Sequence, residues 1–137
     1  MAKSHAIDFG KIGILTMEII LLMFALQCKH LIVDWCWQPA YEYKNKGTYL
    51  HLGGLQHAFK NALGTMICFV PFVDPISLLW IYVMDYWLHY HIDYCKMNIN
   101  RIKGWGPLTH EQFWWLTGLD QWCHQVTYLL LIWMFVV

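Results

Sequence analysis

Residues 85–96 have the sequence DYWLHYHIDYCK and indicate a long helix with one polar face. Four ionisable side chains recur in it at i, i+4, i+8 and i+11, positions that share one face of an α-helix. They are Asp85, His89, Asp93 and Lys96. Apolar residues dominate the preceding stretch, 75–84. Because ionisable side chains inside a membrane helix are costly, each marks a functional site by default.

The composition favours a membrane protein with one domain. The chain has 137 residues, of which 58% are hydrophobic and 13% charged, and this is too apolar for an ordinary soluble domain. Nine tryptophans and eight tyrosines suit a protein that is anchored at two membrane interfaces. The formal net charge is zero, so nothing indicates nucleic acid as a partner. We expect membrane lipids to be the main partner, and an oligomer is possible.

Five cysteines without C-x-x-C spacing argue against a zinc ribbon or a disulfide framework. We interpret them as reduced, packed thiols. A sulfur ligand from Cys95 or Cys123, close in sequence to candidate ligands, is a less favoured alternative.

Four membrane helices are predicted at about 11–35, 50–73, 75–97 and 109–137, within a single polytopic domain that covers residues 1–137. Each has more than 20 residues, enough to cross a hydrocarbon core of about 30 Å. Asp74-Pro75 predicts the start of the third helix, with a capping aspartate before a proline at the first helical position. Thr109 and Gln112 match a capping box for the fourth. The predicted fold class is all-α, a four-transmembrane-helix up-and-down bundle.

Each predicted helix is polar in one half and apolar in the other, so up-and-down threading gathers the polar halves in one leaflet. The loops on the polar side contain four basic residues, and the opposite side contains Lys3 and Lys11. The basic residues on the polar side are Lys44, Lys46, Arg101 and Lys103. Because basic residues concentrate in cytoplasmic loops, we expect the polar side to face the cytoplasm and the termini to lie outside.

A histidine falls in the polar half of every predicted helix, and three of the four have an aspartate one turn away. A histidine and a carboxylate at this spacing can bind one metal ion, or the carboxylate can orient the imidazole that does. The predicted metal ligands are drawn from His30, Asp34, His89, Asp93, Asp120 and His124. His57, on the remaining helix, is predicted to be a further ligand or a general base. Gln38, Asp85 and Gln121 are predicted to support these residues.

Nitrogen and oxygen ligands suit a divalent ion such as zinc, manganese or iron. The set is large enough for one ion with supporting residues, or for two ions. A bound ion could lower the pKa of a water molecule and generate hydroxide near neutral pH. Lys96 would then bind an anionic group of the substrate, such as phosphate. The pattern predicts a metal-dependent membrane hydrolase that acts on a lipid-linked or phosphate-containing substrate.

The order of these motifs resembles an uncharacterised family of small four-helix membrane proteins of bacteria and their phages. The resemblance covers residues 27–131 and rests on His30-x-x-x-Asp34, Gln38, His57-Ala58, His89-x-x-x-Asp93-x-x-Lys96 and Asp120-Gln121-x-x-His124. It implies a bacterial inner membrane, or that of a phage host, and roles for these histidines and aspartates. More loosely, the pattern is similar to membrane-embedded metal-dependent hydrolases. One departure is Lys60-Asn61 after His57, where apolar residues or another histidine would be expected, and this would leave one ligand fewer.

Other functions fit the same pattern. Chains of Asp and His also form relays that transport protons or metal ions. Paired histidines could ligate haem, although haem does not require the aspartates. A non-catalytic phage or bacterial membrane protein could use the pairs only as hydrogen bonds that hold its helices together.

Overall fold

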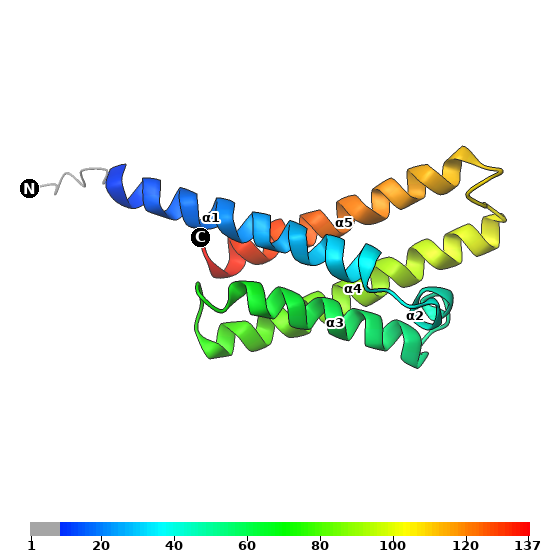
Figure 1. Ribbon diagram of the computed structural model, residues 1–137, viewed down its shortest axis with the longest axis horizontal. Coiled ribbons are helices and arrows are strands. Elements are labelled where there is room, and N and C mark those ends of the chain that lie inside the picture. The colour runs from blue at the N-terminus through cyan, green and yellow to red at the C-terminus, as the bar shows by residue number, and fades with distance from the viewer. Residues whose placement is uncertain (1–8) are drawn as a thin grey trace, which may run out of the picture.

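The computed structural model describes residues 9–137, and Lys3 lies outside them. The described chain forms five α-helices and one π-helical segment and no strand, so the all-α prediction is confirmed (Figure 1). The elements are α1 Phe9–His30, η1 Leu31–Cys36, α2 Ala40–Asn45, α3 Leu52–Phe69, α4 Pro75–Lys103 and α5 Glu111–Phe135. Four of the helices are long, and η1 continues α1 directly.

The long helices run alternately in opposite directions (Figure 1). The α3–α4 turn and the C-terminus lie at the end of the molecule where α1 begins, and the α4–α5 turn and α2 lie at the other end. Helix α3 packs against α4 and α1, α5 packs against α4, and the short α2 packs on α3. This threading brings the polar half of each long helix to the same end.

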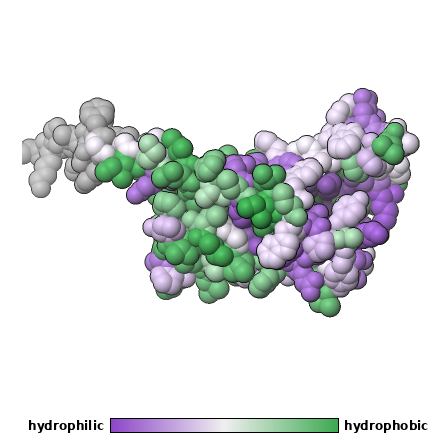
Figure 2. Space-filling model, in the orientation of Figure 1, coloured by the Kyte–Doolittle hydropathy of each residue, from purple (hydrophilic) through white to green (hydrophobic). Residues whose placement is uncertain are grey.

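The interior is divided into an apolar layer and a polar layer. The apolar layer consists of Leu22, Leu26, Phe69, Ile81, Tyr128, Leu131 and Ile132, which are all buried. Hydrophobic residues also cover the surface at this end, and hydrophilic residues gather toward the other end (Figure 2). Buried histidines, carboxylates and lysines fill the second half of the bundle. The division follows the hydropathy pattern of the four helices.

The start of α4 agrees with its sequence signal. Asp74 accepts hydrogen bonds from the backbone of Ile76 at 3.0 Å and of Ser77 at 3.2 Å, and Pro75 is the first helical residue. The Ser77 hydroxyl also donates to Asp74 at 2.6 Å, and together these bonds lower the pKa of that carboxyl. Helix α4 runs beyond the predicted end at residue 97 because its last turn closes only at Gly104, which has a φ of 67°.

Two features differ from the sequence interpretation. Helix α5 begins at Glu111 with His110 at the N-cap and no side-chain cap. The predicted capping box is therefore wrong, since the Thr109 hydroxyl lies 2.7 Å from His110 Nδ1 instead. Helix α2 forms within a connection for which the sequence pattern predicts no helix.

Length and composition allow one helix of the described chain to cross a membrane, Gly13–Cys36. The four-transmembrane-helix arrangement therefore stays a prediction.

Candidate metal centre

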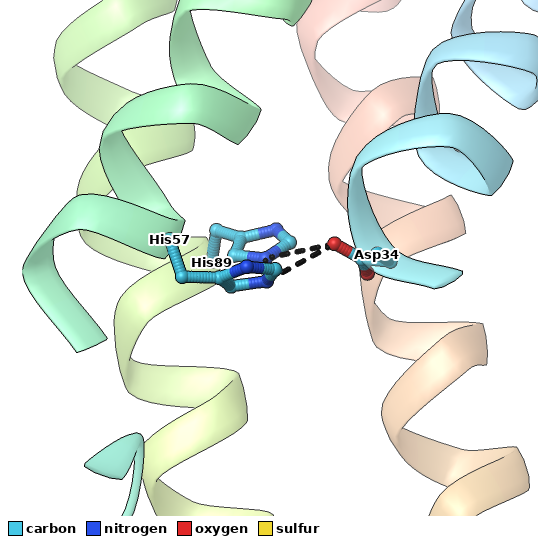
Figure 3. A group of neighbouring side chains, drawn as sticks. All are labelled: Asp34, His57 and His89. Carbon is cyan, nitrogen blue, oxygen red and sulfur yellow. Dashed lines mark hydrogen bonds and ion pairs between the residues drawn. The ribbon is translucent and has the colours of Figure 1, made fainter. Parts of the chain in front are cut away.

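Four side-chain atoms from three elements converge on one point in the polar layer. They are Asp34 Oδ1 from η1, His57 Nε2 from α3, and His89 Nε2 and Asp93 Oδ2 from α4. Figure 3 shows both imidazoles directed at the Asp34 carboxylate. All four side chains are at least nine-tenths buried.

The distances from each imidazole nitrogen to the other three atoms are close to the edges of a metal coordination polyhedron. His57 Nε2 lies 3.1 Å from Asp34 Oδ1, 3.2 Å from His89 Nε2 and 3.4 Å from Asp93 Oδ2. His89 Nε2 lies 3.5 Å from each of the two carboxylate oxygens. Ligand atoms about 2.0–2.1 Å from a tetrahedral ion are separated by about 3.3–3.4 Å. Asp34, His57 and His89 therefore form a group that could hold one ion, and Asp93 Oδ2 lies 3.4–3.5 Å from both imidazole nitrogens.

A carboxylate holds the outer nitrogen of the His57 ring. Glu42 Oε2 from α2 lies 3.4 Å from His57 Nδ1, and the Gln38 amide lies 3.1 Å from the same atom. Lys60 Nζ lies 2.8 Å from Glu42 Oε2 and also donates to the backbone oxygen of Trp37 at 2.7 Å. A carboxylate behind a histidine fixes the tautomer that directs the opposite nitrogen toward a metal. The Gln38 amide also lies 3.2 Å from His57 Nε2, so it stands beside both nitrogens of this ring.

Helix α2 supplies two contacts that the sequence interpretation missed, Glu42 and Lys46. Lys46 Nζ lies 2.8 Å from Asp93 Oδ2. The helix can approach α3 closely because a Cβ atom at Gly53 would lie 2.7 Å from the Tyr41 backbone oxygen. The signals that could have revealed α2 are Pro39 before it and Gly47 just beyond it, since both residue types commonly bracket helices.

A second layer of polar contacts lies beneath the four atoms. Asn61 Nδ2 donates to Asp34 Oδ1 at 2.7 Å and lies 3.1 Å from His57 Nε2. Lys29 Nζ donates to Asn61 Oδ1 at 3.1 Å and to the Tyr128 hydroxyl at 2.9 Å. Asn61, at the position where another histidine was expected, therefore connects the convergent atoms to a buried lysine.

Asp85 lies in this second layer and does not reach the convergent atoms. Its Oδ2 accepts a hydrogen bond from the Thr65 hydroxyl at 2.8 Å and lies 3.9 Å from Lys29 Nζ. Asp85 is thus connected to the convergent atoms only indirectly, through Lys29 and Asn61.

His30 also lies beside the convergent atoms. Its Nδ1 is 3.0 Å from the Tyr128 hydroxyl and 3.4 Å from Asp34 Oδ2, and its Nε2 is 2.8 Å from Gln121 Oε1. Both ring nitrogens are therefore engaged by other side chains. The structure places His30 where it orients the second oxygen of Asp34.

His124 and Asp120 form a second cluster next to the first. His124 Nε2 lies 3.7 Å from Asp120 Oδ1 and 3.9 Å from Asp93 Oδ1, and its ring stacks on His89 with centroids 4.2 Å apart. His124 Nε2 and Asp120 Oδ1 are buried and have no hydrogen-bond partner among residues 9–137, which is uncommon for polar atoms in a folded protein. His89, Asp93 and His124 make up a second group that could hold a metal ion.

The other oxygen of Asp120 has two partners. Lys96 Nζ lies 3.5 Å from Asp120 Oδ2, and the Gln121 amide donates to that oxygen at 3.0 Å. Lys96 and Gln121 are thus placed at the second cluster rather than at the four convergent atoms.

A cavity of about 300 Å³ gives access to both clusters. Asp34, Asp93 and Asp120 lie on its polar wall together with Lys46 and Lys96. Its remaining walls are largely aromatic and include Trp35, Tyr43, Phe113 and Trp114. A small polar group could therefore reach the carboxylates from outside the bundle.

The net charge of the groups around the centre favours a bound cation. Within residues 9–137, five carboxylates and four ammonium groups surround it. They are Asp34, Glu42, Asp85, Asp93 and Asp120, and Lys29, Lys46, Lys60 and Lys96. With neutral histidines and every other group ionised, one negative charge is in excess. A divalent ion would convert this to one positive charge, which would favour an anionic substrate.

A family model described as a protein of unknown function, DUF3307, matches residues 21–137. The chain belongs to the DUF3307 family. The matched region contains every residue of the two clusters, and the predicted resemblance to an uncharacterised family is confirmed. No curated protein and no solved structure is detectably similar to this DUF3307 protein.

Proposed function

We propose that this DUF3307 protein is an integral protein of the bacterial inner membrane with all four long helices in the bilayer. The distribution of side chains supports this, because the interior of one half is charged while the outward faces are apolar. Half or more of the area of Leu79, Trp87, Leu119, Leu129 and Trp133 is exposed, among many others. Large exposed apolar surfaces mark contact with lipid or protein. The basic residues of the polar end favour its cytoplasmic location.

We further propose that the centre binds zinc, manganese or iron and catalyses hydrolysis. The observation that carries this proposal is that His57 Nε2 and His89 Nε2 lie 3.1–3.5 Å from each other, from Asp34 Oδ1 and from Asp93 Oδ2. Without a shared cation or shared protons, these lone pairs would repel each other at such distances. In this assignment His57 is a ligand rather than a general base.

The surrounding residues have roles that derive from their contacts. A bound ion would supply Lewis acidity and an activated water. Glu42 holds the His57 tautomer, and His30 and Asn61 orient Asp34. His124 and Asp120, whose facing atoms have no hydrogen-bond partner, could accept a proton or hold a second ion. Lys46 and Lys96 line the access cavity, where their ammonium groups could bind an anionic group.

The substrate class is inferred from the depth and the charge of the site. A lipid-linked or phosphate-containing compound would present an anionic group to the lysines, and water would be added across its ester bond. The buried apolar layer lies between this centre and the end where α1 begins and the C-terminus lies. For this reason we favour hydrolysis over transport of protons or metal ions.

Elemental analysis of the purified protein tests the metal centre. Wild type should contain about one equivalent of zinc, manganese or iron per chain, or take it up on reconstitution, and His89→Ala/Asp93→Ala should lose it. His91→Ala is the matched control, because His91 lies on the same helix but contacts the Trp87 backbone oxygen at 2.7 Å. A folded wild type that no divalent ion loads would refute the proposal. Loaded protein should hydrolyse a lipid phosphoester, and a chelator should abolish that activity.

A further inference from the structure

An apolar groove of about 280 Å³ lies between α4 and α5, outside the metal centre. Helix α4 contributes Leu88, His91, Ile92, Cys95 and Ile99 to its walls, and helix α5 contributes Leu116, Leu119 and Cys123. Helices α4 and α5 pack against each other, and the turn that joins them lies at the end of the molecule where α2 lies (Figure 1). None of the four residues whose atoms converge at the centre lines this groove.

The groove adjoins the polar access cavity. Lys96 and Asp120 line both spaces, so the apolar walls begin where the charged wall ends. Lys96 Nζ and Asp120 Oδ2, 3.5 Å apart, mark the boundary between them. A molecule that filled both spaces would need a polar end next to Lys96 and an apolar end against Leu116 and Leu119.

A divalent ion at the centre would favour an anionic polar end on such a molecule, because it would outweigh the excess of carboxylates over lysines on the cavity wall. Lys46 and Lys96 are the two cations on the cavity wall, and a divalent ion at the centre would make the surroundings net positive. The apolar end would have to be narrow, because it passes between two neighbouring helices. These requirements describe a phosphoester with an alkyl chain.

We propose that the substrate is an amphiphile, a phosphate ester whose head group occupies the access cavity and whose alkyl chain lies in the α4–α5 groove. This proposal rests on the hydrolase function proposed above and names its substrate class. Leu119 is half exposed on the outer surface of α5, so the groove is open along its side. The chain would therefore enter laterally from the bilayer, while the head group reaches the carboxylates.

Binding of n-hexyl phosphate and of inorganic phosphate tests the groove. Both are titrated into the zinc-loaded protein in lipid nanodiscs, with empty nanodiscs as the blank, and the metal content of each sample is measured. Wild type should bind hexyl phosphate roughly tenfold or more tightly than phosphate, since each methylene taken from water adds affinity. Leu119→Trp, which fills the groove, should abolish this preference and keep phosphate binding. Leu129→Trp is the matched control, since both leucines are about half exposed on α5 and Leu129 lines none of the cavities described above.

A second measurement does not depend on a variant. Hexyl phosphate should slow alkylation of Cys95 and Cys123, which line the groove, but not of Cys36, which is exposed elsewhere. Equal affinity for the two phosphates, an unchanged preference in Leu119→Trp, or unprotected groove cysteines would overturn the proposal. If any of these results came from protein that contains zinc, only the substrate class would be wrong and the metal centre would stand. If the protein failed to retain zinc, the proposed hydrolase function itself would be refuted.

Discussion

Glu42→Gln isolates the contribution of the carboxylate behind His57 to metal affinity. The substitution keeps the shape of the side chain but removes the charge that lies 3.4 Å from His57 Nδ1. An ion bound to the opposite ring nitrogen would lie about 7 Å from that charge. At an effective dielectric constant of about 20, the carboxylate and a divalent ion would attract each other by about 5 kcal/mol.

The measured loss should be smaller than this limit. Lys60, 2.8 Å from the same carboxylate, loses its partner in the variant and can turn away from the ion, because its side chain is 16% exposed. Loss of a residue that orients a ligand typically weakens metal binding by about 10–100-fold, or about 1.4–2.7 kcal/mol. We expect Glu42→Gln to reach at least this range. Glu42→Gln/Lys60→Gln should lose no more than the single variant, since both charges are gone.

Competition with a chromophoric zinc chelator of known affinity measures these changes. Glu18→Gln is the control, because Glu18 is an exposed carboxylate on α1. If Glu42→Gln binds zinc within twofold of wild type while His89→Ala does not bind it, the assigned role of Glu42 is wrong. If the double variant binds more weakly than the single one, the electrostatic argument fails.

Three further predictions concern stability and zinc binding. Lys29→Met leaves Asp85 buried without its cation and should lower the free energy of unfolding by about 3 kcal/mol, as measured by chemical denaturation. A Lys29→Met/Asp85→Leu variant should recover most of this loss, because it also removes the unpaired carboxylate. Gly53→Ala should displace α2 and weaken zinc binding, whereas Gly118→Ala, with open space around it, should not; equal affinities would contradict the role of α2. Because the folded-state pKa of Asp74 is lowered, its contribution to stability is present above the usual aspartate pKa and is lost as the pH falls through the lowered value. Melting curves of Asp74→Asn should therefore depend less on acidic pH than those of wild type.

The long helices and the polar layer could be predicted because they depend on local patterns. Asp74-Pro75 marks a helix start through contacts between neighbours in sequence, and the structure has the same contacts. The four-residue spacing of His89 and Asp93 likewise places both on one helical face, and both join the convergent atoms.

The division of roles among the histidines could not be predicted from helical phase. His30 and His57 both lie on inward faces, yet only His57 has an imidazole nitrogen among the four convergent atoms. The difference arises from tertiary contacts, since Tyr128 and Gln121 on α5 engage the His30 ring. The contacts of Glu42 and Lys46 with the centre could not be predicted either, because a helix of six residues has almost no periodicity in its sequence.

The π-helical segment η1 has a consequence for how this centre could have arisen. Its wider winding closes with a bond from the Trp37 backbone nitrogen to the Ile32 oxygen at 2.7 Å, five residues back. Such a bulge corresponds to an α-helix with one inserted residue, and bulges of this kind often occur at functional sites. Deleting one residue from η1 would restore α-helical winding and rotate the residues after the deletion by about 100° relative to α1. A single inserted codon in an ancestral helix could thus have turned Asp34 toward the two histidines, and a one-residue deletion would be the reverse step.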